Sequence, residues 1–176
     1  MIAAVRTEFL RYKALAEGAI GQMSDADLTT APGDDGNSVA VICQHVAGNL
    51  VSRFTDFLST DGEKPWRDRD TEFAQTLVTR DAILQRWSEG WQVLRHTLDG
   101  LTDADLTRTV TIRQHLLSVT EALLRSLAHV SYHVGQIVLI AKTARGSAWV
   151  SLSIPRGQSA AYNAAPNREK SPNTTR

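Results

Sequence analysis

The chain has 176 residues, of which 42% are hydrophobic, and its 19 basic and 19 acidic side chains give a formal net charge of zero. This length predicts a single domain that is large enough to enclose a hydrophobic core. The balanced charge predicts no overall attraction to nucleic acid or to an anionic membrane. Basic and acidic residues are interleaved, and the Arg-Asp-Arg-Asp run at 67–70 indicates a solvated surface.

Cysteine usage and apolar runs favour a cytoplasmic protein that does not enter a membrane. Cys43 is the only cysteine of the sequence, so no disulfide can form within the chain. Residues 1–13 lack the basic start and apolar run of a signal peptide. The longest nearly uncharged stretch, residues 127–141, is too short and too polar to span a bilayer.

Four segments have the 3.6-residue periodicity of amphipathic helices. They cover about residues 2–23, 37–58, 81–98 and 118–143. Asn37 or Ser38 is a suitable N-cap for the second segment. Ser118 and Glu121 have the spacing of a capping box, in which each side chain accepts a backbone N–H of the other residue. The fourth helix is therefore expected to begin at Ser118.

The connections between the helices contain two weaker patterns. Residues 107–114 have alternating β-branched side chains and predict a short extended segment or hairpin arm without an obvious partner strand. A six-residue motif occurs twice, at Ser24–Thr29 and at Thr102–Thr107, and each copy predicts an N-capped helical turn. The repeat favours two related helix pairs, although six residues can also match by chance.

These patterns together predict an all-α four-helix bundle with short irregular connections. The bundle domain is expected to cover residues 1–160. Residues 161–176 are rich in Ala, Asn, Pro, Ser and Thr, which cannot bury much apolar area, and predict a flexible tail.

The fourth helix is apolar on almost every side but carries one line of polar residues. His129 and His133 lie one turn apart on this line, which also includes Arg125, Ser126 and Gln136. A helix with this pattern is expected to be buried, and buried polar groups need partners. Binding of one metal ion is one way to pair two neighbouring imidazoles.

The second helix has a similar polar line inside an apolar helix, and this line contains His45. Three histidine ligands with one open position form the typical arrangement of a catalytic zinc site. The competing interpretation is that each histidine is a hydrogen-bonded core residue. That interpretation has weight because His129 and His133 lack the intervening Glu of the H-E-x-x-H motif.

Other titratable residues are weaker candidates for a site. Cys43 lies on nearly the opposite side of its helix from His45 and is expected to be a small buried hydrophobe. Asp56 is about 16 Å from His45 along the helix axis, too far for a shared ligand. His96 is expected to be exposed, and His115 to be a surface residue or a support for a ligand. The sequence contains no Gly-rich phosphate loop, G-x-S-x-G turn or paired-carboxylate motif.

Three segments, at 37–70, 125–142 and 151–163, resemble the DinB-like superfamily, also called the YfiT-like metalloenzymes. The similarity is greatest to a branch of small bacterial proteins. The resemblance implies a four-helix bundle whose metal, zinc or nickel, is held by one His of the second helix and an H-x-x-x-H pair of the fourth. Those positions correspond to His45, His129 and His133. One departure is Leu117, where that branch often has a His.

The resemblance also implies a class of chemistry, because characterised members include transferases and isomerases that depend on low-molecular-weight thiols. We expect a metal-dependent enzyme with a small-molecule substrate, either a small-thiol-dependent S-transferase or a hydrolase. Arg125 and Gln136 are candidates to support a ligand or to contact the substrate. Arg125 could instead form a structural salt bridge.

A non-catalytic stress-related or assembly bundle, whose metal would only stiffen the core, is the alternative interpretation. A solvent-accessible pocket beside the three histidines would favour the enzyme, and an enclosed site would favour the alternative. Zero net charge and the lack of a basic stripe disfavour a nucleic-acid partner. A homodimer is implied by the resemblance, with Trp66 and Trp149 as its main support in the sequence.

Overall fold

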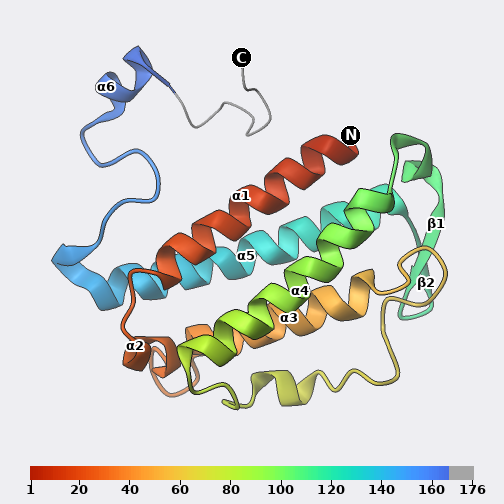
Figure 1. Cartoon of the computed structure of the whole chain (residues 1–176), viewed down its shortest axis with the longest axis horizontal. Coiled ribbons are helices and arrows are strands. Elements are labelled where there is room, and N and C mark those ends of the chain that lie inside the picture. Colours follow the sequence, from red (N-terminus) through yellow and green to blue (C-terminus); the bar gives the residue numbers. More distant parts are fainter. Residues whose placement is uncertain (167–176) are drawn as a thin grey trace.

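The computed structural model describes residues 1–166, which are mostly helical, as predicted. Four long helices lie side by side in this part of the chain (Figure 1). They are α1 (Ile2–Ile20), α3 (Val39–Phe54), α4 (Arg80–Gly100) and α5 (Val119–Arg145). Helix α5 packs against α1 and α3, and α4 packs against α3.

Shorter elements lie in the connections between these helices and in the segment after α5. The α-helical ones are α2 (Asp25–Thr29) and α6 (Ser159–Ala164). Three 3₁₀ turns are η1 (Asp70–Phe73), η2 (Asp103–Thr107) and η3 (Gly146–Ala148). Strands β1 (Thr109–Ile112) and β2 (His115–Ser118) form an antiparallel hairpin directly before α5.

Capping hydrogen bonds start the helices where the sequence predicted them. Ser118 Oγ accepts the N–H of Glu121 at 3.2 Å, and the Glu121 carboxylate accepts the N–H of Ser118 at 2.7 Å. Ser38 caps α3 through the N–H of Val41. Helix α3 ends at Phe54, earlier than predicted, and Asp56 just beyond it has a φ of +49°, which a regular helix cannot contain.

Both copies of the repeated six-residue motif form capped turns, as predicted. In α2 the capping box joins Ser24 to Asp27, and in η2 it joins Thr102 to Asp105. The second copy is a 3₁₀ turn rather than an α-helix. Each turn follows a long helix, α2 after α1 and η2 after α4. The motif therefore occurs where the chain turns away from one long helix toward the next.

The predicted extended segment has a partner that the sequence did not reveal. β1 pairs with β2, with Thr109 opposite Ser118 and Ile112 opposite His115. The turn residues Arg113 and Gln114 have φ of +53° and +65°. Hairpin turns of this kind usually contain Asn or Gly, so the turn lacked its common sequence signal. The Asp61 carboxylate accepts the N–H groups of Arg113 and Gln114, both at 2.8 Å, and so holds the hairpin tip.

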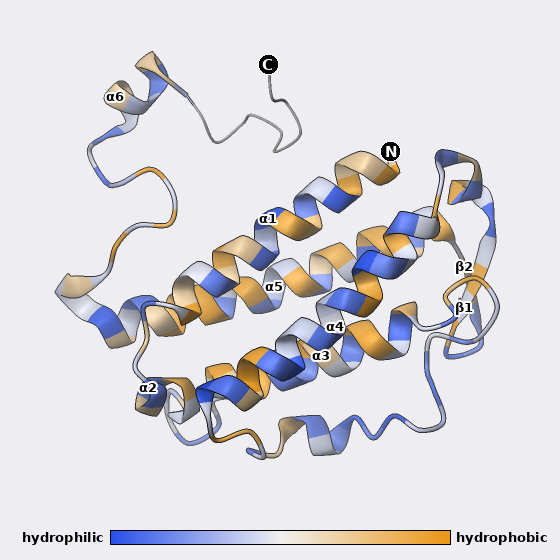
Figure 2. Cartoon of the chain, in the orientation of Figure 1, coloured by the Kyte–Doolittle hydropathy of each residue, from blue (hydrophilic) through white to orange (hydrophobic). Residues whose placement is uncertain are grey.

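Apolar and polar residues alternate along the long helices (Figure 2), and the buried residues are mainly the apolar ones. Trp87 and Trp91 of α4 are 1% and 4% exposed. Phe9 of α1 makes edge contacts with Phe54 of α3 and with Trp91 of α4. This aromatic cluster connects three helices at the centre of the core.

The C-terminal region contains two short elements that the sequence did not predict, the 3₁₀ turn η3 and the helix α6. The proposed domain end at residue 160 and the flexible tail over 161–176 remain predictions, and residues 167–176 lie outside the described part of the chain. A search of residues 1–166 for a helix of sufficient length and apolarity to cross a membrane finds none.

Close packing of α3 against α4 depends on a glycine, Gly90 of α4, at the contact between the two helices. A Cβ atom on Gly90 would lie 2.6 Å from Cα of Ala47 and 3.0 Å from its Cβ and carbonyl oxygen. Backbone atoms cannot move aside as a flexible side chain can. Gly90 therefore fixes the distance between α4 and the helix that carries His45.

Replacing Gly90 by Ala should lower the free energy of unfolding by about 1–3 kcal/mol, because the added methyl group forces the two helices apart. Urea denaturation measures this loss. Gly100→Ala in the same helix is the matched control, because a Cβ there meets no atom within 4 Å. Equal stabilities of the two variants would contradict this account of the α3–α4 contact.

Candidate metal centre

The three histidines predicted to share a metal lie together in the structure. One ring nitrogen from each of His45, His129 and His133 lies within 4.8 Å of the other two. The Nε2 atoms of His45 and His129 are 3.2 Å apart. Metal–nitrogen bonds of about 2.0–2.1 Å in tetrahedral geometry place two ligand nitrogens about 3.3 Å apart. The spacing therefore suits a single divalent ion.

The three imidazole rings come from two neighbouring helices, α3 and α5. His129 and His133 are four residues apart on α5, and their ring centroids are 4.6 Å apart. His45 lies on α3, which packs against α5, and its ring centroid is 5.2 Å from that of His129 and 4.9 Å from that of His133. His45 is 3% exposed, whereas the pair on α5 is partly buried. The site thus lies at the edge of the α3–α5 contact.

Hydrogen bonds orient two of the three rings. His45 Nδ1 lies 2.8 Å from Oε2 of Glu72, and His133 Nδ1 lies 2.7 Å from Oε1 of Gln136. Because both partners accept, each Nδ1 donates its hydrogen, and Nε2 is the nitrogen of each ring that is directed toward the other histidines. This is the tautomer that binds a metal through Nε2. His129 Nδ1 is buried and has no hydrogen-bond partner within residues 1–166.

Glu72, which the sequence did not indicate, is held by a second buried residue. Arg67 donates from Nε to Oε1 and from Nη2 to Oε2 of Glu72, both at 2.8 Å. The Arg67 side chain is 2% exposed, so the interpretation of 67–70 as a solvated surface is wrong for this residue. Burial raises the pKa of Glu72, but hydrogen bonds from His45 and Arg67 outweigh this effect and bring the pKa below its ordinary value.

A glycine makes room for this carboxylate. Gly48 lies one turn after His45 on α3, and a Cβ atom there would be 2.3 Å from Oε1 of Glu72. The ring of Phe73, next to Glu72, lies on the ring of His45 with centroids 4.6 Å apart. His45 is therefore fixed by a hydrogen bond at one nitrogen and by an aromatic contact on its face.

The histidines of α5 are kept neutral by their surroundings. Burial is the main cause that lowers the pKa of His129 to about 3, and electrostatic interactions with His133, His45, Arg67 and Arg53 contribute to the same shift. Burial also lowers the pKa of His133, although its hydrogen bond with Gln136 opposes the shift. Neutral imidazole is the form that binds metal, so protons compete little for these two nitrogens near pH 7.

The two residues predicted to support the site occupy different places. Gln136 contacts His133 directly, as expected for a residue that orients a ligand. Arg125 lies in the wall of a cavity together with His45 and His129. It forms no salt bridge with any residue of the described chain, so the structural interpretation of Arg125 is not supported.

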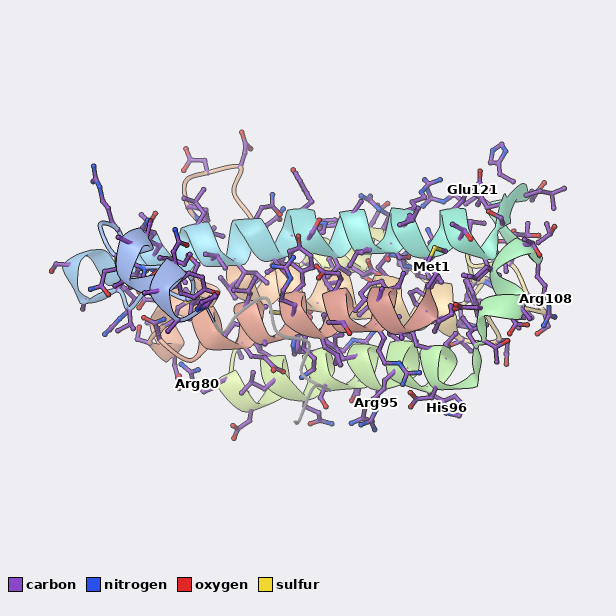
Figure 3. All side chains as sticks on the ribbon, turned by 90° about the horizontal axis from the view of Figure 1, so that it is seen from above. Met1, Arg80, Arg95, His96, Arg108 and Glu121 are labelled. Atoms are coloured by element: carbon purple, nitrogen blue, oxygen red, sulfur yellow. The ribbon has the colours of Figure 1, made fainter. Side chains whose placement is uncertain are left out.

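The weaker candidates lie away from the site. Cys43 is fully buried, as expected, and burial raises the pKa of its thiol. His96 and His115 are exposed, and His96 lies on the outer side of α4 (Figure 3). Asp56 is exposed beyond the end of α3. None of these residues belongs to the group of ligand atoms around His45.

The cavity beside the histidines has a volume of about 170 Å³. It reaches the surface through exposed residues of α5 and the hairpin turn. Its lining residues are His45, Asn49, Arg53, Arg67, Arg69, Ile112, Arg113, Arg125, Ser126 and His129. Within residues 1–166, no carboxylate or cysteine joins the histidine group as a fourth ligand. The arrangement therefore offers three imidazoles, an open coordination position and an adjacent space for a small molecule.

Comparison with known proteins supports the fold and leaves the function open. A family model described as "Protein of unknown function (DUF1572)" matches residues 1–158. The structure is similar to the crystal structure of the conserved protein of a locus from Enterococcus faecalis, with a TM-score of 0.59 and 16% sequence identity. The match covers 81% of this chain and 95% of that one. No curated protein matches the chain.

Glu72→Gln should weaken the binding of added zinc by roughly 10-fold or more, because the amide is a poorer acceptor for His45 Nδ1–H and loses one contact with Arg67. Competition with a chromogenic chelator measures the affinity. Asp70→Asn is the matched control, since this exposed carboxylate lies in the same 3₁₀ turn and contacts neither His45 nor Arg67. Equal affinities in both variants would contradict the orienting role of Glu72.

Acid should destabilise the metal-free protein partly through His129. Its pKa is about 3 in the folded state and near 6.5 when unfolded, so only the unfolded chain takes up a proton between these values. The stabilisation is complete above pH 6.5 and declines as the pH falls toward 3. Urea denaturation at pH 7, 6, 5 and 4 should show a smaller loss for His129→Gln than for the parent. Parallel losses would refute this assignment.

Proposed function

The chain belongs to the DUF1572 family of proteins of unknown function, and we propose that it is a divalent-metal-dependent enzyme whose metal ligands are His45, His129 and His133. The convergence of three ligand nitrogens within 4.8 Å is the observation that carries this proposal. The cavity beside two of these histidines supports the proposal, because a small-molecule substrate would reach the site through it.

The donor set suits zinc or nickel, because neutral imidazole is a preferred ligand of both ions. When bound, the metal supplies Lewis-acid chemistry, in which a thiol or water at the open position has a lowered pKa and is a nucleophile near pH 7. Glu72 and Gln136 would keep His45 and His133 in the tautomer that presents Nε2. Their contribution is to hold the ligands in place before the ion arrives.

For the reaction, we propose small-thiol-dependent S-transfer, or hydrolysis with water as the nucleophile. The proposal rests on the resemblance to the DinB-like superfamily, and a low-molecular-weight thiol would then be the second cofactor. We also propose the four-helix-bundle architecture of that superfamily. It is supported by the contacts of α5 with α1 and α3, and of α4 with α3 and α1.

We further propose that the protein acts as a homodimer. Leu124, Tyr132 and Leu139 are 52%, 65% and 66% exposed, and their spacing of eight and seven residues keeps them on one side of α5. Burial of this side against a second copy would remove apolar area from water. Trp66 is also exposed, at 59%, whereas Trp149 packs against the core.

One observation favours the alternative of a non-catalytic stress-related or assembly bundle. The 3.2 Å between the Nε2 atoms of His45 and His129 also suits a hydrogen bond from His129 to His45. The histidines would then stiffen the α3–α5 contact without a metal. This alternative does not explain the cavity beside the histidines.

Metal content distinguishes the two functions. Protein purified without an affinity tag should contain about one zinc or nickel ion per chain by elemental mass spectrometry, and alanine variants of His45, His129 and His133 should contain little. His96→Ala, on the exposed side of α4, is the matched control and should keep the parental content.

The same variants then test catalysis. S-transfer from small thiols to electrophilic acceptors, and ester or amide hydrolysis, should be lost together with the metal. Full metal occupancy in all three alanine variants would refute the ligand assignment. A parent protein that binds neither zinc nor nickel when these are added would favour the non-catalytic alternative.

A further inference from the structure

Five arginines surround the cavity beside the histidines, although the whole chain has no net charge. They come from four parts of the chain: α3, the segment between α3 and α4, the hairpin turn and α5. They are Arg53, Arg67, Arg69, Arg113 and Arg125. Local positive charge is thus concentrated at one place by folding.

Carboxylates neutralise only part of this charge. Glu63 and Glu72 are the carboxylates that pair with arginines of the cavity. The paired residues are Arg53, Arg67 and Arg113, at nitrogen–oxygen distances of 2.8–3.7 Å. Arg69 and Arg125 have no carboxylate partner within residues 1–166. Three of the five guanidinium groups therefore form salt bridges with two carboxylates, and Asp61 is a third carboxylate close to Arg53, so the cavity keeps an excess of positive charge.

Hydrogen-bond donors in the wall are also left without acceptors. Arg67 uses Nε and Nη2 for Glu72, while its buried Nη1 has no hydrogen-bond partner and lies 3.7 Å from Glu63. The amide of Asn49, one turn after His45, makes no side-chain hydrogen bond in the described chain. A buried guanidinium N–H without an acceptor is unfavourable, and the described part of the chain does not fully satisfy the guanidinium of Arg67.

The wall of the cavity is in contact with a proposed metal ligand. The guanidinium carbon of Arg69 lies 4.8 Å from the ring centroid of Phe73, and Phe73 stacks on His45. Arg125 precedes His129 by four residues on α5 and so lies on the same side of that helix. A group bound by these arginines would lie next to the two histidines.

We infer that this cavity binds the anionic group of a small substrate, a carboxylate or a phosphate, beside His45 and His129. Guanidinium groups bind both kinds of oxyanion through paired N–H donors. The volume of about 170 Å³ is below the roughly 300–1,000 Å³ of pockets that enclose drug-sized ligands, so the cavity holds a small anion or one end of a longer molecule. The role of this anion as substrate rests on the proposed function, whereas its binding does not require metal.

Calorimetric titration of the metal-free full chain at low salt tests the inference. Inorganic phosphate and succinate are the two probes, and succinamide is the neutral analogue of succinate. At least one anion should bind, and succinamide should not. Tighter binding of phosphate or of succinate identifies the anionic group that the cavity prefers. No binding of either anion at millimolar concentration, or equal binding of succinamide, would overturn the inference.

Variants locate the binding to the cavity. Arg69→Gln and Arg125→Gln remove exposed arginines that hold no carboxylate of the protein, and each should weaken anion binding roughly tenfold or more. Arg95→Gln is the matched control, because Arg95 is exposed on the outer side of α4 (Figure 3). Unchanged anion affinity in the double variant would overturn the assignment.

Two measurements separate this inference from the metal proposal. Arg125→Gln should keep the parental metal content, because Arg125 is not a ligand. His129→Ala should still bind the anion after losing the metal. Loss of anion binding in His129→Ala, despite a native circular dichroism spectrum, would show that the arginines alone do not form the site.

Discussion

The buried contact of Glu72 with both Arg67 and His45 is the constraint on which the site depends. It ties the irregular segment between α3 and α4 to the histidine of α3, and it fixes the tautomer of that ring. Gly48 makes the contact possible because a side chain there would occupy the place of the carboxylate. Charged groups that are buried together are costly to separate, since removal of one partner leaves the other charge unpaired. The segment, in which η1 is a single short 3₁₀ turn, is therefore held against α3 by this contact.

Different sides of helix α5 face the candidate site, the hydrophobic core and the exterior of the protein. One side carries Arg125, His129 and His133, which face the cavity or the histidine group. Val130 and Ile137 are buried in the core on another side. Leu124 and Leu139 remain exposed on the outside, where the homodimer is proposed. A long helix that is apolar on most sides can serve a core, a site and a surface at once.

The site contains two kinds of nitrogen group with different electrostatic roles: neutral histidines that suit a metal ion and charged arginines that suit an anion. Neutral histidines suit a metal ion, and burial keeps the pKa of His129 low. Arginines next to them suit an anion and add to the lowering of that pKa. A divalent cation and several guanidinium groups repel one another at close range, and a bound anion would relieve this repulsion. The proposed metal centre and the proposed anion site are thus physically compatible neighbours.

The sequence by itself determined the features that depend on contacts within a few residues. Helix starts at Ser38 and Ser118, the two capped turns, and the pairing of His129 with His133 all follow from local hydrogen bonds or the helical repeat. His45 was identified by its place on a polar line of a buried helix. Only the tertiary structure decided which distant residues complete the site. Glu72 and the five arginines lie in segments without periodicity, or are spread over four parts of the chain, so no local pattern indicates that they meet.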